Sequence, residues 1–310
     1  MNLFDLHCDT ATRLLAENQG LYKNTFHISL EKAEKFKSYA QVMAIWTHRK
    51  LTDAQGYERF FEVIKNLENE VKINHMYAGL AKNSKDINSL LSQDKRALIV
   101  SVEDARILEN DISRLDVLYS CGVRMMTLNW AGETCIGGAH DTNTGLTDFG
   151  IRVVEKCFEK GIIPDISHSS FKGAKMALEL AVEHQKPIVA SHSNSYFVNH
   201  HTRNLQDDDF VTIQKLGGLV GINLCPEHLS PRTDTNLSDV IKHIEHYISL
   251  GGENTVAFGC DLDGTNLPKG FESISDIEKI IEELGRLNYT NELIEKISFS
   301  NALDFFNKTL

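Results

Sequence analysis

The sequence contains no C-x-x-C pair, although it has six cysteines, at positions 8, 121, 135, 157, 225 and 260. In a chain of 310 residues, such scattered cysteines indicate reduced, mostly buried thiols and argue against a disulfide framework. Cys8 and Cys260 are direct neighbours of two acidic residues, Asp9 and Asp261. Because successive side chains of a strand point to opposite sides, we expect both thiols to point away from these carboxylates and into the core.

The chain also lacks an excess of positive charge and any long apolar run. Its formal net charge of -11 argues against a nucleic-acid partner, which would favour basic patches. No apolar stretch approaches the roughly 18 residues of a membrane span, so we expect no membrane association. Met1 leads directly into the first strand and Asp5 interrupts any signal-peptide core, so we expect a cytoplasmic protein. The oligomeric state stays open, a homodimer included.

Short apolar runs recur along the chain, and helical patterns separate most of them. The first run ends in Phe4–Thr10, and the other seven span residues 39–46, 96–103, 123–129, 161–168, 187–192, 218–224 and 255–261. They lack the polar alternation of half-exposed strands, as expected when both faces of a sheet are buried. We therefore predict one (β/α)8 barrel domain over residues 1–310, with further helices from about residue 274.

A doubly wound open sheet is the main alternative to the barrel. Such a sheet would bind a nucleotide through a glycine-rich turn after its first strand. No G-x-G-x-x-G or G-x-x-x-x-G-K-[ST] pattern occurs there, so the barrel is favoured. Within it we expect a helix from Thr52, a helix capped by Ser169 or Ser170, and a loop over the glycine-rich segment 132–145.

Residues able to bind metals lie at the ends of five predicted strands. His7 and Asp9 end the first run, Glu103 the third, His168 the fifth, His192 the sixth and Asp261 the eighth. A single His-x-Asp triplet often arises by chance. In a barrel, however, the C-terminal ends of all strands converge on one mouth, which is where barrel enzymes place their chemistry. The pattern therefore predicts a metal site at that mouth.

The expected ligands are nitrogen and oxygen atoms, a set that suits zinc and tolerates manganese, iron or cobalt. Three histidines and three carboxylates exceed what one four-coordinate ion needs. Two metals that share one carboxylate, with another carboxylate left for proton transfer, would use them all. Two-metal sites of this kind typically generate a bridging hydroxide and polarise a carbonyl, which is the chemistry of hydrolysis.

The sequence resembles the membrane (renal) dipeptidase family of binuclear zinc metallopeptidases, as a soluble bacterial-type member. The resemblance extends in order over nearly the whole chain. It is carried by Phe4–Thr10, Ser101-Val102-Glu103, Asp165–His168, Ser191-His192-Ser193, Arg203–Asp208 and Gly259–Gly264.

The resemblance implies a role for each site residue. His7 and Asp9 would bind one zinc ion, His168 and His192 would bind the other, and Glu103 would bridge the two. Asp261 stands at the position the family uses for proton transfer. Arg203 stands at the position that meets the carboxylate of a dipeptide substrate. The resemblance thus implies a metal-dependent dipeptidase with a metal-bridging hydroxide.

Two positions depart from the better-known animal members of the family. Those members carry a histidine after the fourth strand that can contact the tetrahedral intermediate, whereas here Asn129 is followed by Trp130. A tyrosine that helps to hold the carboxylate is replaced by His228 if no gap intervenes. We expect Trp130 and His228 to contact the substrate and to affect its selection more than the type of reaction.

Two other functions compete with a dipeptidase. A binuclear-metal amidohydrolase acting on another small amide or a lactam would share the metals and Asp261, but would have no use for Arg203. A catalytically idle metal-binding or scaffold protein would be expected to have lost Asp261 or one of the ligands, and the sequence retains them all.

Overall fold

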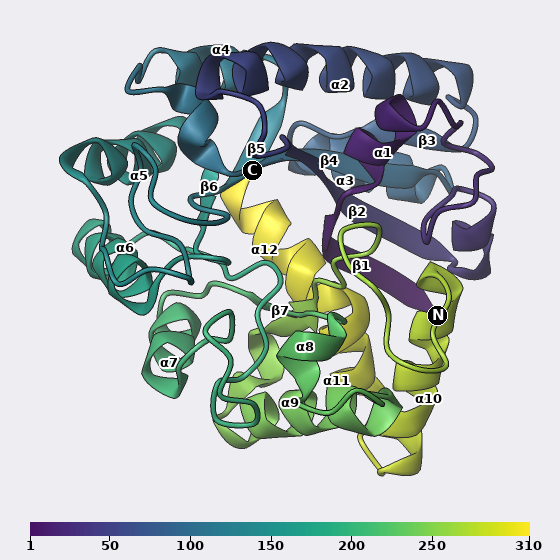
Figure 1. Cartoon of the computed structure of the whole chain (residues 1–310). Helices are drawn as coiled ribbons and strands as arrows, with labels where there is room; N and C mark the ends of the chain where they lie inside the picture. The colour runs from purple at the N-terminus through teal and green to yellow at the C-terminus, as the bar shows by residue number, and fades with distance from the viewer.

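A parallel sheet forms the centre of the molecule (Figure 1). The computed structural model describes residues 1–310. Its eight strands are β1 (Asn2–Cys8), β2 (Ser38–Trp46), β3 (Ala78–Leu80), β4 (Arg96–Glu103), β5 (Val123–Thr127), β6 (Ile163–Asp165), β7 (Val220–Ile222) and β8 (Val256–Phe258). The pairing order is β6-β5-β4-β2-β1-β8-β7, and β3 pairs only with β4, outside this path.

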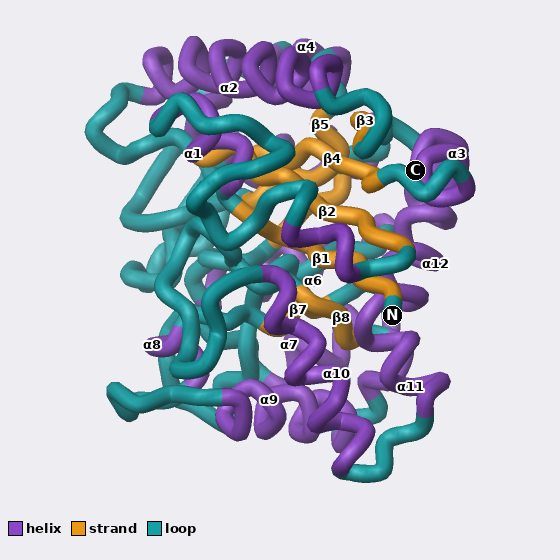
Figure 2. Tube along the Cα trace, turned by 90° about the vertical axis from the view of Figure 1, so that its right-hand side faces the viewer, coloured by secondary structure: helices purple, strands orange, loops and turns teal.

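Residues 189–190 close the sheet into a barrel. Val189 forms a parallel bridge with Asp165 at the end of β6, and Ala190 forms one with Val220 at the start of β7. The path from β6 round to β7 thereby becomes a ring in which residues 189–190 take the eighth place. This confirms the predicted (β/α)8 barrel. Figure 2 shows the strands at the centre of the molecule with helices around them.

The strands differ from the prediction in two ways: several of them are shorter, and one was not predicted. The predicted strand over 187–192 makes only isolated bridges, because the side chain of Asp165 replaces the ladder there: its Oδ1 accepts from the backbone amide of Ser191 at 2.9 Å. The runs at 161–168, 218–224 and 255–261 also contain strands of only three residues each. The second difference is β3, which the sequence did not predict because its three residues add only an edge to β4.

Twelve α-helices surround the sheet. They are α1 (Thr10–Ala16), α2 (Asp53–Ile73), α3 (Ser84–Ser92), α4 (Arg114–Ser120), α5 (Asp148–Lys160), α6 (Phe171–His184), α7 (Asp207–Lys215), α8 (Pro226–Leu229), α9 (Leu237–Ser249), α10 (Ile277–Arg286), α11 (Asn291–Glu295) and α12 (Asn301–Thr309). Thr52 forms a capping box with Gln55 at the start of α2, and the Ser170 hydroxyl accepts from Gly173 at the start of α6, as predicted. None of the helices is long and apolar enough to cross a membrane.

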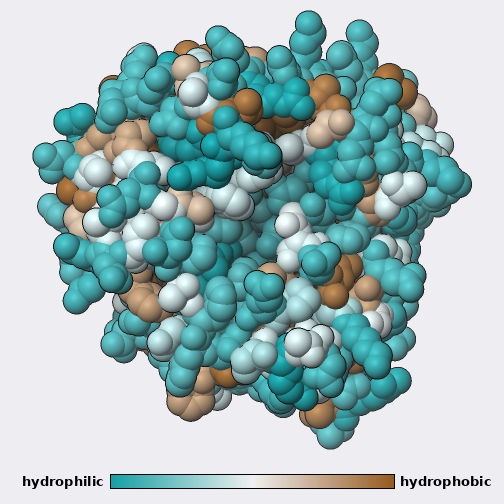
Figure 3. Space-filling model, in the orientation of Figure 1, coloured by the Kyte–Doolittle hydropathy of each residue, from teal (hydrophilic) through white to brown (hydrophobic).

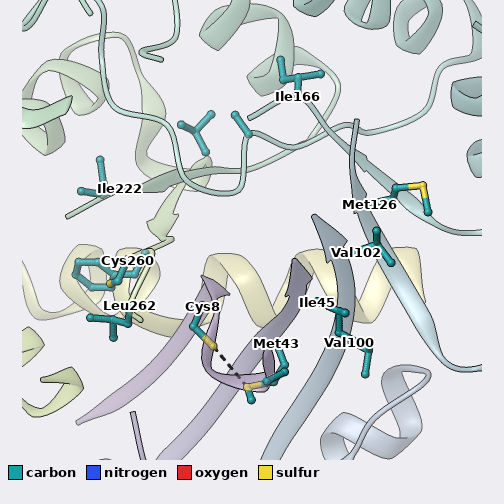
Figure 4. Close-up of a cluster of buried hydrophobic side chains, with 14 of the residues drawn as sticks. Cys8, Met43, Ile45, Val100, Val102, Met126, Ile166, Ile222, Cys260 and Leu262 are labelled. Carbon is teal, nitrogen blue, oxygen red and sulfur yellow. Dashed lines mark hydrogen bonds between the residues drawn. The ribbon is translucent and has the colours of Figure 1, made fainter. Parts of the chain in front are cut away.

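Successive side chains of β1 point to opposite faces of the sheet and pack into two different regions of the core. Phe4 and Leu6 belong to a smaller apolar cluster, in which the Phe4 ring stacks on Phe306 of α12 with ring centroids 5.0 Å apart. Cys8 belongs to the larger cluster, and its thiol lies 3.5 Å from the Met43 sulfur (Figure 4). Cys260 is buried in the same cluster. Both thiols therefore pack in the core, as the strand alternation predicted.

The face seen in Figure 1 is hollowed near its centre, and mainly hydrophilic residues surround the hollow (Figure 3). The glycine-rich segment 132–145 contains no helix or strand, as predicted, and makes only isolated bridges.

Candidate metal centre and substrate pocket

All six predicted metal and proton-transfer residues come together at the C-terminal ends of the strands. They come from five parts of the ring: His7 is the penultimate residue of β1 and Asp9 follows β1, Glu103 ends β4, His168 follows β6, His192 follows the closing bridges, and Asp261 follows β8. His7 and His192 are fully buried, and Glu103 is 3 % exposed. In a barrel the C-terminal ends of the strands converge on one mouth, and the predicted barrel therefore required these residues to lie close together.

His7 lies among three carboxylates. Its Nε2 is 3.6 Å from Asp9 Oδ2, 3.7 Å from Glu103 Oε2 and 3.8 Å from Asp261 Oδ1. Neither ring nitrogen of His7 has a hydrogen-bond partner. Burial alone would lower the pKa of His7, but the surrounding carboxylates, Glu103 first, outweigh it and raise the pKa to about 10. This arrangement stabilises positive charge at the centre of the carboxylates.

His168 and His192 face each other across a very short distance. Their Nε2 atoms lie 2.9 Å apart, and Glu103 Oε1 is 3.1 Å from the first and 3.6 Å from the second. His168 Nδ1 lies 3.0 Å from the carbonyl oxygen of Trp130, to which it can only donate. With Nδ1 protonated, the neutral ring of His168 presents a lone pair at Nε2.

His192 is oriented through a hydroxyl and a carboxylate. Its Nδ1 lies 2.7 Å from Ser191 Oγ, which donates to Asp165 Oδ2 at 2.6 Å. With the serine proton directed to Asp165, Nδ1 of His192 is the donor and Nε2 carries a lone pair. Two imidazole lone pairs and a carboxylate oxygen therefore converge, a donor set that fits a divalent cation such as zinc.

Glu103 connects the two halves of the centre, since one carboxylate oxygen faces His7 and the other faces the His168–His192 pair. Burial raises the pKa of Glu103 well above its usual range, and the neighbouring Asp9 raises it further. In the absence of cations, a carboxyl group in this position favours its protonated form.

Asp261 lies beside His7 and is held by two hydrogen bonds. Its backbone amide donates to the His7 carbonyl at 3.2 Å, and Asn223 Nδ2 donates to its Oδ2 at 3.3 Å. Burial raises its pKa to about 6, although the charge of His7 lowers it. Gly264 also approaches closely: a Cβ at this position would lie 2.1 Å from Asp9 Oδ2 and 2.4 Å from Asp261 Oδ1. Only glycine fits there without moving the carboxylates.

Arg203 is buried beside the metal centre without an acceptor for its charge. It is 5 % exposed, and its Nε and Nη2 atoms have no hydrogen-bond partner. Burial lowers its pKa, while the nearby carboxylates of Asp261 and Glu103 raise it. In turn, its charge lowers the pKa of His168 and of His228. A buried guanidinium that lacks partners is costly unless a ligand supplies an anion.

A comparison with known proteins assigns the chain to a family. Residues 1–309 match the sequence profile of the membrane dipeptidases, peptidase family M19. The chain belongs to this family. It is 30% identical over 237 residues to an uncharacterized dipeptidase of Schizosaccharomyces pombe, a match that covers 72% of this chain and 55% of the relative. The chain thus spans about half the length of this curated relative.

Three solved structures have the same fold. The metallopeptidase dipeptidase AC superimposes with a TM-score of 0.93 at 24% identity, covering 100% of this chain and 98% of that one. A Rhodobacter sphaeroides metallopeptidase, liganded with a phosphinate mimic of the dipeptide L-Ala-D-Ala, gives 0.92 at 23% identity and covers 100% and 99%. The probable dipeptidase PvdM of Pseudomonas aeruginosa gives 0.91 at 20% identity and covers 100% and 95%.

Trp130 and His228, the two residues that we expect to contact the substrate, both line one cavity. The cavity has a volume of about 410 Å³ and is bordered by Glu103, His168 and Asp261 as well as by Trp130 and His228. The Trp130 ring lies 6.1 Å from that of His168. The ring of His228, in α8, is tilted relative to that of His201, with the ring centroids 4.8 Å apart. Burial, followed by the charge of Arg203, lowers the pKa of His228 to about 2, so its imidazole is neutral.

Several residues of the cavity wall were not predicted from the sequence. They are Thr12 and Arg13 of α1, Trp46 at the end of β2, and Asp263, Gly264 and Thr265 after β8. Asp263 and Gly264 belong to the Gly259–Gly264 segment that carried the resemblance to the family. Trp46 is the last residue of the predicted strand over residues 39–46, which is a signal that could have identified it. Because a tryptophan is not a metal ligand, the comparison of strand ends did not select it.

Proposed function

We propose that this M19 chain is a metal-dependent dipeptidase that hydrolyses the peptide bond of short dipeptides, and that residues 1–310 act as one barrel domain. The observation that carries this proposal is the buried, unpartnered guanidinium of Arg203 next to the cluster of His and carboxylate side chains. A free dipeptide offers both a scissile amide and a carboxylate a short distance away. These two features match the cluster and the guanidinium.

The cluster would hold two zinc ions. His7 and Asp9 would bind one ion, His168 and His192 the other, and Glu103 would bind both. The facing Nε2 lone pairs and the unpartnered nitrogens of His7 support this assignment. Divalent cations in such a site polarise a carbonyl group and lower the pKa of water to near neutrality.

Asp261 would move the proton. Its carboxylate lies beside the cluster and lines the substrate cavity, so it can accept a proton from the attacking water and deliver it to the leaving amine. The hydrogen bond from Asn223 to Oδ2 leaves Oδ1 directed towards His7 and the cluster. Asp261 would therefore act first as general base and then as general acid.

Arg203 would bind the substrate carboxylate. A guanidinium offers a planar fork that a carboxylate fits bidentately, which lysine cannot reproduce. His228 and Trp130 border the cavity that Glu103, His168 and Asp261 also line, and we assign them substrate contacts. His228 is neutral and therefore adds no second positive charge close to the guanidinium.

The test compares free dipeptides with their C-terminal amides, using L,L and L,D pairs and the zinc-loaded protein. We expect wild type to prefer the free acid. Arg203→Ala should weaken catalysis of the acid by about 2 kcal/mol or more, expressed mainly in KM. The same variant should scarcely change turnover of the amide, and Arg203→Lys should recover only part of the loss. Equal turnover of acid and amide by wild type would instead favour an amidohydrolase acting on another small amide or a lactam.

A further inference from the structure

Asp5 is a buried carboxylate of β1 that the proposed reaction does not use. It is fully buried and lies two residues before His7. Its Oδ1 accepts from two backbone amides, that of His7 at 3.3 Å and that of Cys260 at 2.9 Å. One oxygen thus connects the backbone of a proposed metal ligand with the residue that directly precedes Asp261.

This oxygen acts where the pairing of β1 with β8 is interrupted. The two strands share one register pair, Asp5 with Phe258, and β8 ends at Phe258. The next bridge between these segments joins Cys8 to Leu262. β1 also changes its register against β2 between Asp5 and Cys8, and irregularities of this kind redirect the side chains within them. His7 lies inside this interval, so the Asp5 carboxylate fixes its backbone where the ladder is irregular.

The residue after Cys260 has a strained backbone. Asp261 has a φ of 57°, in the left-handed region that residues other than glycine rarely adopt. Such a conformation persists only when the surrounding structure fixes it, and it is common at functional sites. His168 repeats the arrangement: its φ is 69°, and the amide of the preceding Ser167 donates to Oδ1 of the buried Asp165 at 2.9 Å. Both strained site residues thus follow a residue whose amide is bound by a buried carboxylate.

Asp5 and Asp165 make matching contacts at Oδ1 and different contacts at Oδ2. In each, Oδ1 accepts from the amide two residues later and from one amide of the neighbouring segment. Asp165 Oδ2 also accepts from the hydroxyls of Thr127 and Ser191, both at 2.6 Å. Asp5 Oδ2 is buried without any hydrogen-bond partner. Position 5 therefore requires a single oxygen acceptor, which the side chain of asparagine also offers.

We propose that Asp5 is a positioning residue, whose Oδ1 sets the strained backbone of Asp261 relative to His7 by fixing both segments. The two positioned side chains lie close together, with 3.8 Å between His7 Nε2 and Asp261 Oδ1. A displacement of about 1 Å at such a site can cost about 10²-fold in rate. The kinetic part of this inference depends on the proposed dipeptidase function, whereas the metal-binding part depends only on the metal cluster.

The test compares Asp5→Ala, which removes the acceptor, with Asp5→Asn, which keeps it. We expect Asp5→Ala to lower zinc affinity, measured by competition with a chelator, by about 10–100-fold, the usual effect of losing a contact behind a metal ligand. At saturating zinc its kcat for dipeptides should fall by about 10²-fold with KM near the wild-type value, because the placement of Asp261 is lost and substrate binding is not. Asp5→Asn should recover most of the zinc affinity and most of kcat.

Asp239→Ala is the matched control for the loss of a buried carboxylate. Asp239 is 2 % exposed in α9, and its Oδ2 accepts from the Asn236 amide at 3.1 Å. We expect this variant to melt at a lower temperature than wild type and to keep the wild-type zinc affinity and kcat. If Asp5→Ala does not fold, Asp5→Ser takes its place, because a serine side chain is one atom shorter and its hydroxyl cannot occupy the Oδ1 position.

The outcomes separate this inference from the function on which its kinetic part depends. Equal losses in Asp5→Asn and Asp5→Ala would overturn the role of Oδ1 as an acceptor, because the charge would then be what matters. Wild-type zinc affinity and kcat in Asp5→Ala, with only a lower melting temperature, would overturn the positioning role. Absence of hydrolysis of every dipeptide by wild type would overturn the proposed function, and the recovery of zinc affinity in Asp5→Asn would still decide the role of Asp5.

Discussion

Glu103 Oε1 lies 3.1 Å from Nε2 of His168, whereas the other carboxylate oxygen of Glu103 faces His7 at 3.7 Å. One side chain thus reaches both groups of nitrogen donors, although β4, which carries it, is separated from β6 by β5 in the sheet. In the proposed two-metal assignment, binding of both ions would therefore depend on the single carboxylate of Glu103.

We therefore expect Glu103→Ala to reduce binding at both metal positions. Wild type reconstituted with zinc should approach two equivalents per chain by elemental analysis, and the variant should lose affinity for both because a shared ligand serves both ions. Glu133→Ala removes a carboxylate from an exposed loop and should bind zinc as wild type does. A reproducible single equivalent in fully active wild type would contradict the two-metal assignment.

Zinc uptake should release protons near neutral pH. The surrounding carboxylates outweigh burial and raise the pKa of His7 to about 10, whereas burial, followed by the neighbouring Asp9, raises the pKa of Glu103 well above its usual range. At pH 7 the metal-free protein therefore holds protons that zinc must displace, and affinity should fall as the pH is lowered. Titration calorimetry in two buffers of different ionisation enthalpy measures the number released. Identical apparent enthalpies in both buffers would argue against these protonation states.

Asp261→Asn should retain zinc and lose catalysis. The amide keeps the shape of the side chain and an oxygen for Asn223, but it cannot carry the proton, and general acid–base help typically contributes about 10²–10⁴-fold. Measuring kcat and bound zinc on the same sample tests this. Loss of zinc in proportion to activity would instead identify Asp261 as a metal ligand, consistent with its grouping with His7 and Asp9.

Gly264→Ala should weaken the metal centre without unfolding the barrel. The added Cβ would overlap Asp9 Oδ2 and Asp261 Oδ1, so both carboxylates would have to move, and we expect zinc affinity to fall by about 10–100-fold. Gly285→Ala in α10 is the matched control, because the nearest atom to its Cβ is 4.0 Å away. That variant should bind zinc normally and be stabilised by about 0.5–1 kcal/mol. Unchanged zinc affinity in Gly264→Ala would show that the carboxylates adjust freely.

The candidate metal residues could be predicted because each one depends on local sequence and on a general rule of barrels. His7, Glu103 and Asp261 follow apolar runs, and the ends of parallel strands meet at one mouth whatever the loops between them do. The resemblance to the dipeptidase family then added Arg203. Its position in a polar loop would not by itself have identified it as a site residue. The roles assigned to these residues stay predictions until the experiments above are done.

The tertiary structure alone determined the contacts between residues that are far apart in the chain. The side chain of Asp165 both interrupts the predicted strand at Ser191 and orients His192 through the serine hydroxyl, and no local pattern encodes a contact over such a separation. Strand periodicity determines which residues are buried and where a strand ends. Which buried donors are left without a partner depends on packing between distant segments, and packing exists only in the folded barrel.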